Sequence, residues 1–446
     1  MHRIIKFGPL FTLMLTLALA LPGQAANAEG PRIEQWTTGG GIEVYFVRND
    51  ALPIVDLSLL FDAGSARDGN LPGLASITSS LLSESAAGMG AGAIARRFED
   101  QGARFSASSG RDSASVSLRS LNDPDTLSGA MGALADVIGR PDFPETAVER
   151  ERRRMQVALN MDRQSPGAIA SRAFWETAYG DHPYAIPPGG TEESLSAISR
   201  EDILGFHRRY YVRANATLAV VGAISRQEAE QLAHVIDKAL PTGEEATPMP
   251  TAPMPDEGQV VRIAFRSAQS HIVMGQPGYA RGDEAHFPLY VGNHVLGGSG
   301  LVSRLGEEMR EERGLSYSVS SQFSPMKANG PFMVNTQVRS DRTDEAREVL
   351  RENLAELRDT GPDAEELDDA IRNITGSFPL NLDSNNKIVG YVGNIGFHGL
   401  PLDYLDTFTR NIEAVTSEAV RTAFAERLDP DRMITVIVGP EEDEAD

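Results

Sequence analysis

The sequence has no cysteine, only 8 histidines in 446 residues, and 41 basic against 63 acidic residues. The absence of cysteine excludes disulfides, thiolate catalysis and a lipid-modified cysteine. The net charge of -22 argues against a nucleic-acid partner, because phosphate binding requires basic patches. We interpret the acidic excess as a contribution to solubility.

The histidines are too scattered for a zinc site formed by this chain alone. Zinc sites usually take two ligands one helical turn apart and a more distant third. No two histidines are separated by three or four residues. His286 and His294 would lie about 12 Å apart along a helix, too far to share one ion. We therefore expect no metal in this chain and interpret the histidines as surface or packing residues.

Serine catalysis and phosphate binding are also disfavoured. The nearest approach to a nucleophile motif is GGSGL at 297–301, which lacks the Gly-x-Ser-x-Gly spacing of a nucleophile elbow. The same loop has no following Lys-Ser or Lys-Thr to hold a phosphate and its metal. We therefore expect neither chemistry from this loop.

Residues 1–28 have the pattern of a secretory signal peptide. Arg3 and Lys6 precede or enter an apolar region, and Ala26-Asn27-Ala28 offers small residues for cleavage. The apolar run LFTLMLTLALALPG is shorter than the ~20 residues of a membrane span, which disfavours an uncleaved anchor. We expect cleavage near Ala28, a periplasmic location, and no membrane association after cleavage.

The remaining chain is long enough for two domains. Residues 241–258 are rich in proline and acidic residues and lack an apolar period, which predicts an exposed linker. We therefore place an N-terminal domain at 29–240 and a C-terminal domain at 259–446. Period-two apolar runs alternate with helical stretches in both, which indicates an α+β or α/β sandwich used twice.

The two halves also align with each other. Aligning Gly102 with Gly314 pairs Phe98 with Arg310 and Phe105 with Tyr317. Each half ends in an apolar strand that stops at a glycine, LAVVG in the first and TVIVG in the second. A repeat of this length indicates two related domains.

The stretch MREERGLSYSVSSQF predicts a helix that carries Arg310, a left-handed cap at Gly314, and a following strand. Strict alternation places Tyr317 on the apolar side of that strand with Leu315 and Val319. Taken by itself, the stretch is an amphipathic helix and a strand, with Tyr317 in the core and Arg310 paired to Glu307 or Glu311.

Four longer stretches resemble the pitrilysin or insulinase family of zinc peptidases, in the form where two separate subunits build one active site. They are, in order, FDAGSARDGNLPGLA, HPYAIPPGGTEESLSAISREDILGFHRRYYVRANATLAVVG, HVLGGSGLVSRLGEEMREERGLSYSV and GLPLDYLDTFTRNIEAVTSEAV. The resemblance spans nearly the whole mature sequence. It implies an α+β fold of two homologous domains, each a mainly antiparallel sheet packed with helices, as in the metallopeptidase/LuxS-like double domain.

The resemblance also implies that the metal site has been lost. The family's His-x-x-Glu-His motif falls on Ser76, Ser79 and Ser80 within NLPGLASITSSLLSES, and the position of its distant glutamate falls on Ala158. Alanine cannot ligate, and a serine hydroxyl is a poor zinc ligand and no substitute for a carboxylate base. This chain is therefore expected to bind no catalytic metal.

Two other family features are retained. Similar proteins hold the substrate peptide with an arginine and a tyrosine seven residues apart, a spacing that Arg310 and Tyr317 match. The glycine-rich turn is similar to a loop near the peptide channel of related subunits, although a simple helix-breaking turn is an equal alternative. Its glycines are Gly297, Gly298 and Gly300.

The resemblance thus implies a non-catalytic subunit of a periplasmic, heterodimeric zinc endopeptidase. A partner subunit of the same family would carry the zinc motif and the zinc, and this chain would contribute Arg310 and Tyr317. A peptide or unfolded chain would bind in extended form at a sheet edge. A scaffold or binding protein of the same fold without a peptidase role explains the missing ligands equally well. An independent enzyme with a different metal site is the third alternative.

Overall fold

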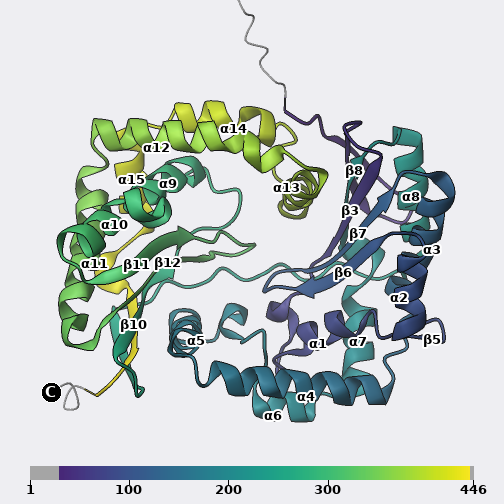
Figure 1. Cartoon of the computed structure of the whole chain (residues 1–446), viewed down its shortest axis with the longest axis horizontal. Helices are drawn as coiled ribbons and strands as arrows, with labels where there is room; N and C mark the ends of the chain where they lie inside the picture. Colours follow the sequence, from purple (N-terminus) through teal and green to yellow (C-terminus); the bar gives the residue numbers. More distant parts are fainter. Residues whose placement is uncertain (1–29, 442–446) are drawn as a thin grey trace, which may run out of the picture.

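The computed structural model describes residues 30–441. Their strands form two main sheets, one from the chain before residues 241–258 and one from the chain after them (Figure 1). The strands of the first sheet are β1 (Glu34–Thr37), β2 (Glu43–Arg48), β3 (Ile54–Phe61), β6 (Arg104–Ser109), β7 (Ala114–Leu121) and β8 (Ala216–Gly222). Those of the second sheet are β9 (Gln259–Ala264), β10 (Gln269–Pro277), β11 (Ser316–Phe323), β12 (Pro331–Arg339) and β13 (Ile434–Gly439). A small separate hairpin consists of β4 (Ser85–Ala86) and β5 (Met89–Gly90).

The two sheets have the same topology. The first has the order β1-β2-β8-β3-β7-β6, with β2 and β8 parallel and the other neighbouring pairs antiparallel. The second has the order β9-β13-β10-β12-β11, with β9 and β13 parallel and the other pairs antiparallel. Apart from the extra edge strand β1, each strand of the first sheet has a counterpart in the second. The α+β fold of two homologous domains is confirmed.

Helices follow the strands in a similar order in both halves. The α-helices of the first half are α1 (Leu74–Leu81), α2 (Ala91–Glu99), α3 (Pro124–Gly139), α4 (Glu145–Asp162), α5 (Pro166–Tyr179), α6 (Glu192–Ala197), α7 (Arg200–Tyr210) and α8 (Arg226–Ala239). Those of the second half are α9 (His286–Asn293), α10 (Arg304–Gly306), α11 (Thr343–Thr360), α12 (Ala364–Ser377), α13 (Asn385–His398), α14 (Tyr404–Glu413) and α15 (Ser417–Arg427). Several begin with reciprocal side-chain caps, as at Ser199, Ser225 and Asp363, which satisfy the free amides of the first turn.

Shorter helical segments complete the chain. Two are π-helical, η4 (His294–Gly298) and η6 (Glu307–Glu312), and both lie in the second half. The 3-10 segments are η1 (Ser65–Arg67), η2 (Pro183–Ala185), η3 (Arg213–Asn215), η5 (Gly300–Val302), η7 (Ser340–Arg342), η8 (Phe378–Leu382) and η9 (Pro430–Arg432).

The two halves exchange one helix each. Helix α13 of the second half packs on β2, β3 and β8 of the first sheet, and α5 of the first half packs on β10 and β13 of the second (Figure 1). Phe174 and Tyr179 of α5 are buried in one cluster with Val273 and Val436 of the second sheet. Each half therefore completes the apolar core of the other, and the burial of these faces joins the halves into one unit.

Glycines allow α13 to lie unusually close to the first sheet. A Cβ atom on Gly396 would lie 2.5 Å from Cε2 of Tyr45 and 2.8 Å from Cγ2 of Thr217. A Cβ atom on Gly390, in the same helix, would meet nothing within 4 Å. The close approach at Gly396 therefore leaves no room for a side chain, whereas the helix tolerates one at Gly390.

A buried ion network also connects the halves. The carboxylate of Asp62 pairs with Arg67 and with Lys327 of the second half, each at 2.7 Å. The backbone N–H of Lys327 donates to Asp112 at 2.7 Å, and the Tyr184 hydroxyl donates to the other oxygen of that carboxylate at 2.6 Å. Burial raises the pKa of Asp112, although these hydrogen bonds lower it. Removal of one member would leave a buried charge unpaired, so the turn at Lys327 is held firmly against the first half.

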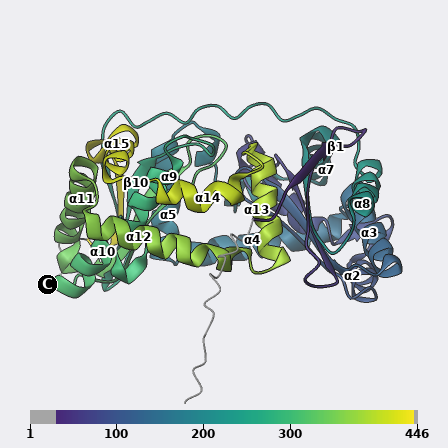
Figure 2. The same ribbon diagram turned by 90° about the horizontal axis from the view of Figure 1, so that it is seen from above.

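Residues 241–258 contain no helix or strand, are mostly exposed, and run along one side of the molecule between the halves (Figure 2). This is the course expected for a linker, with one exception. Ala252 is buried, and the carbonyl oxygen of Pro250 lies 2.9 Å from Nε2 of His182.

Two expectations concern membranes and export. The predicted signal peptide, residues 1–28, lies outside the described residues. Within 30–441, none of the helices combines the length and the apolar character needed to cross a bilayer.

We expect Gly396→Ala to lower the free energy of unfolding by about 1–3 kcal/mol, because the added methyl group forces α13 away from Tyr45 and Thr217. The matched variant Gly390→Ala should leave it unchanged or raise it by up to about 1 kcal/mol, because alanine is the better helix former. Urea unfolding of both variants measures the difference. Equal effects at the two positions would contradict the close packing described for α13.

Candidate functional site

Arg310 and Tyr317 lie in contact, with the guanidinium carbon 4.8 Å from the centre of the tyrosine ring. Arg310 is on the π-helical segment η6 and Tyr317 is on β11, and between them Gly314 has the predicted left-handed conformation, with φ of 57°. This distance is suitable for a cation–π interaction. Local backbone geometry therefore brings together the two residues that the sequence singled out.

The corresponding positions in the first half hold a packed aromatic pair. The rings of Phe98 and Phe105 are stacked with their centres 5.0 Å apart, on either side of Gly102, whose φ is 58°. Phe98 is buried in the core of the first half. The same backbone turn therefore supports an apolar contact in one half and a pair of hydrogen-bond donors in the other.

The expectation that Tyr317 lies on the apolar side of its strand is wrong. Leu315 and Val319 are buried, but Tyr317 is 76% exposed. The pairing of β11 with β12 shifts register between Ser316 and Val319, which interrupts the alternation of side chains. A bulge of this kind re-aims a side chain, and here it turns the phenol outward.

Arg310 remains accessible beside it, with 31% of its side chain exposed. Its Nε lies 3.4 Å from a carboxylate oxygen of Glu311, so the predicted pairing with a neighbouring glutamate is confirmed for Glu311. The ion pair is partly solvated and weak. It leaves most guanidinium N–H groups available to another acceptor.

The glycine-rich turn packs against the same strand. A Cβ atom on Gly297 would lie 2.7 Å from the backbone nitrogen of Ser321 on β11, and Gly300 has a positive φ of 68°. Gly298 lies at the end of the π-helical segment η4, where a Cβ atom would meet Asn293 at 2.7 Å. The three glycines thus permit a close approach and a turn, and the turn is brought beside the strand of Tyr317.

Helix α1 is positioned by a buried carboxylate. Asp68 accepts hydrogen bonds from the backbone N–H groups of Gly73 and Ala75, each at 2.7 Å. Burial raises the pKa of Asp68 to about 7, against the opposing effect of these amides. Asp68 thereby satisfies free donors at the start of the helix that carries the three serines.

The structure brings the former ligand positions together on α1 and the adjacent helix α4. Ser76 donates its hydroxyl to the carbonyl oxygen of Pro188 at 2.7 Å, and Ser79 is buried. Ser80 lies 3.5 Å from Nη2 of Arg154, which is on α4 one turn before Ala158. The positions of the motif are neighbours in space, as the resemblance implies.

These residues do not fit a zinc ion. Ala158 offers no ligand, and the Ser76 hydroxyl is already bonded to Pro188. The guanidinium of Arg154, held by an ion pair with Glu151, places a positive charge beside Ser80. Between residues 30 and 441, no three histidine, aspartate or glutamate side chains are grouped so that they could hold a metal.

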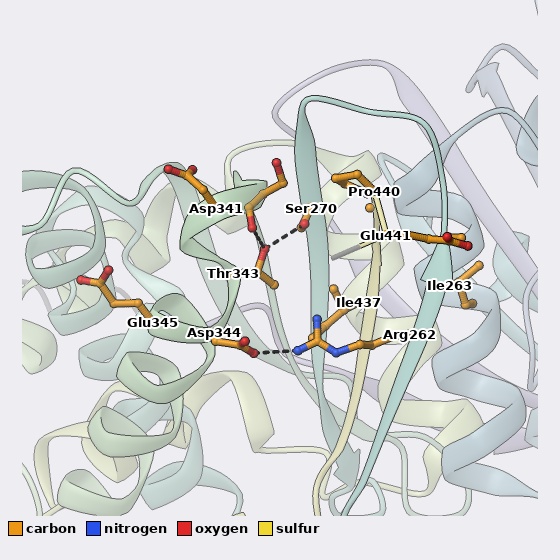
Figure 3. Close-up of a pocket in the computed structure, with 13 residues that line it drawn as sticks. Arg262, Ile263, Ser270, Asp341, Thr343, Asp344, Glu345, Ile437, Pro440 and Glu441 are labelled. Atoms are coloured by element: carbon orange, nitrogen blue, oxygen red, sulfur yellow. Dashed lines mark hydrogen bonds and ion pairs between the residues drawn. The ribbon is translucent and has the colours of Figure 1, made fainter. Parts of the chain in front are cut away.

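Two pockets of about 490 Å³ lie away from Arg310 and Tyr317. One is at the ends of β9 and β13 and the start of α11, where Arg262 reaches Asp344 at 2.7 Å and Thr343 donates to a backbone carbonyl (Figure 3). The other lies between the end of α4, α5 and the loop at 187–190, and Arg111 and Trp175 line it. Arg111 and Trp175 could not be singled out from the sequence, because they are far apart along the chain and belong to no short motif.

The comparisons with known proteins agree with the fold. The model of the insulinase family, peptidase family M16, matches residues 44–192, and that of the peptidase M16 inactive domain matches residues 197–374. The uncharacterized zinc protease YmxG of Bacillus subtilis is 24% identical over 87% of this chain and 94% of its own length. The non-peptidase homolog YmxG of Helicobacter pylori is 24% identical over 92% of this chain and 93% of its own length.

Solved structures extend this similarity. A protease of Helicobacter pylori, 20% identical, has the same fold with a TM-score of 0.84 and covers 92% of this chain and 100% of its own. The crystal structure of a peptidase M16 inactive domain from Pseudomonas fluorescens is 38% identical, with a TM-score of 0.89 over 92% of this chain and 98% of the other. Together with the absent ligands at Ser76, Ser80 and Ala158, these matches show that the chain belongs to the M16 (insulinase) peptidase family, as a member of the inactive type.

Proposed function

We propose that this chain is the non-catalytic subunit of a heterodimeric zinc endopeptidase and that it presents Arg310 and Tyr317 to a peptide bound at the partner's active site. The observation that carries the proposal is the exposure of Tyr317 beside an accessible Arg310. A pair with a purely structural role would be packed, as Phe98 and Phe105 are.

The two side chains are suited to hold a peptide backbone. The phenol and the guanidinium are both hydrogen-bond donors, and their contact at 4.8 Å limits the freedom of each. Donors fixed beforehand stabilise the charge that develops on a scissile carbonyl oxygen without reorganising during the reaction. In this proposal Tyr317 donates to that oxygen and Arg310 donates to a neighbouring carbonyl of the peptide.

The strand that carries Tyr317 is available for pairing. Strand β11 is at the edge of the second sheet and pairs with β12 on one side. An edge strand presents free backbone N–H and C=O groups to which an extended peptide can be added. Backbone pairing gives affinity with little demand on peptide sequence, which is consistent with a peptide or unfolded-chain substrate.

The same end of the second half is suited to a partner surface. The segments η4, η5 and η6 all contact β11. Leu301 on η5 is 57% exposed and Val302 is 82% exposed. Large exposed apolar side chains next to a functional pair favour a protein interface.

The zinc of the proposed pair belongs to the partner, where it would polarise the peptide carbonyl and activate the attacking water. This chain's contribution is limited to binding and orientation, because its own α1 and α4 do not fit the metal. We place the complex in the periplasm, on the basis of the signal-peptide pattern in residues 1–28.

We expect Tyr317→Phe to lower peptide turnover by the reconstituted pair by roughly ten- to a thousandfold, because a donor to the developing oxyanion is removed. The measurement uses this chain with a family member that carries an intact His-x-x-Glu-His motif. Ser320→Ala on the same strand is the matched control and should retain full turnover. The melting temperature of Tyr317→Phe should not change, because the hydroxyl is exposed.

The same experiment tests the alternative that this chain is a scaffold or binding protein without a peptidase role. It is favoured by the Helicobacter pylori relative that is named a non-peptidase homolog. Full activity of the partner alone, or unchanged turnover with Tyr317→Phe, would reject the proposed contribution and support a binding or scaffold role.

The charge of Arg154 leads to a second expectation. A variant with Ser76→His, Ser80→His and Ala158→Glu restores three ligands but should bind zinc weakly, because the guanidinium repels the ion. Adding Arg154→Ala should strengthen zinc binding by roughly tenfold or more, whereas adding Arg153→Ala should not. Metal titration with a competing chelator measures these affinities. Equal zinc affinity with and without Arg154 would show that its charge is irrelevant.

A further inference from the structure

The second pocket has a mixed lining that includes both halves of the chain. Its walls are the end of α4, one side of α5 and the loop at 187–190, and Ile263 of β9 closes it from the second half. The volume of about 490 Å³ is in the range of small-molecule and peptide-residue sites. Ser76 donates to the carbonyl oxygen of Pro188, so the pocket adjoins helix α1 through this loop.

Arg111 is a cation of this pocket without a direct ion-pair partner among the described residues. Its Nη1 donates to the carbonyl oxygens of Tyr184 and Ile186, each at 2.7 Å, and its guanidinium carbon lies 3.6 Å from the centre of the Trp175 ring. Across residues 30–441, no carboxylate forms an ion pair with it. Its remaining N–H groups have no hydrogen-bond partner there, and they are not among the nitrogen atoms sealed from solvent.

Burial disfavours the charged form of Arg111. Burial lowers its pKa to about 10, so the side chain is still positive at neutral pH. Asp112 favours the charged form of Arg111 but makes no ion pair with it, so an anion that bonds directly to the guanidinium would stabilise the buried charge further. The free N–H groups form a planar fork, the geometry that matches a carboxylate with two parallel hydrogen bonds.

The other charged groups of the pocket favour a ligand with a single negative charge. Arg163 is paired with Glu192 at 3.1 Å, and Arg172 is paired with Glu176 at 2.8 Å. Asp162 also lines the pocket and is exposed. Because its carboxylate would repel additional negative charge, the site suits a monoanion better than a phosphate.

The remaining walls are largely apolar. Leu159, Ile169, Trp175 and Ile263 provide aliphatic and aromatic surface around the guanidinium. Trp175 is held in place by its stack on Tyr179, with ring centres 5.0 Å apart. Such walls gain free energy by burying an apolar group, at about 25 cal/mol per Å².

We propose that this pocket binds a carboxylate carried on an apolar or aromatic group, and that its source is the C-terminal residue of a peptide. Arg111 forms the bidentate contact to the carboxylate, and the side chain of the terminal residue lies against Leu159, Ile169 and Ile263 beside Trp175. A free aromatic acid shares this chemistry, and the experiment separates the two sources. The binding does not depend on a partner subunit or on Arg310 and Tyr317.

The two tryptophans of the chain allow a direct test. Trp36 packs under Arg226, and Trp36→Phe leaves Trp175 as the single fluorophore. The purified chain is titrated with the tetrapeptide Ala-Ala-Ala-Phe, with the same peptide amidated at its C-terminus, and with 3-phenylpropionate. We expect a saturable change in Trp175 fluorescence with the free peptide, and binding at least tenfold weaker with the amide.

Three variants in the same background locate the site. Arg111→Gln should weaken binding of the free peptide by about tenfold or more, because the charged fork is lost. Gly189→Leu should also weaken it, because a side chain starting 3.8 Å from Leu159 fills the pocket while Arg111 is retained. Arg172→Gln is the control with a paired arginine and should bind within twofold of the parent. Thermal unfolding of each variant confirms that it is folded.

The outcomes are distinct. Equal binding of acid and amide, unchanged binding in both Arg111→Gln and Gly189→Leu, or no saturable binding of any probe would overturn the proposal. If 3-phenylpropionate binds as tightly as the peptide, the peptide source is rejected. Because the isolated chain is used, failure here leaves the proposed role of Arg310 and Tyr317 untouched, and failure of that role leaves the pocket untouched.

Discussion

The reciprocal packing of α5 and α13 is the constraint on which the rest of the structure depends. Each helix covers the sheet of the opposite half, so neither half has a complete core alone. At Gly396 the helix backbone lies so close to Tyr45 that a methyl group has no space. The Asp62–Lys327 ion pair adds a directional contact between the same halves. Together they set the position of the second sheet, and with it the position of Arg310 and Tyr317, relative to the first.

Within this frame the two halves use one scaffold for different chemistry. The turn at Gly102 and the turn at Gly314 have nearly the same backbone angle. The first connects two packed phenylalanines, and the second connects an arginine and an exposed tyrosine. On helix α1 the positions that match the family's metal ligands carry serines. Ser76 bonds to Pro188, and Ser80 faces Arg154. The exposed polar pair therefore lies in the second half, whereas the corresponding pair of the first half belongs to its apolar core.

Much of the architecture was predictable from local patterns. The strand ends at glycine and the left-handed Gly314 depend on neighbouring residues, and both appear in the structure. The repeat, read from the alignment of the two halves, appears as two sheets of the same topology. The orientation of Tyr317 was not predictable, because strict alternation places it in the core. The register shift against β12 that turns it outward depends on pairing with a strand that is distant along the chain.

By itself, the sequence determined which chemistry is absent. Alanine at 158 and serines at 76 and 80 cannot form a zinc site in any conformation of this chain, because ligation depends on the atoms that a side chain carries. Tertiary structure alone decided which groups meet. In the folded chain the guanidinium of Arg154 lies beside Ser80, and Tyr317 is exposed. Arg111 stacks on Trp175 and keeps some of its guanidinium N–H groups without a hydrogen-bond partner among the described residues. These contacts join residues on separate elements, so they exist only after the helices and sheets have packed.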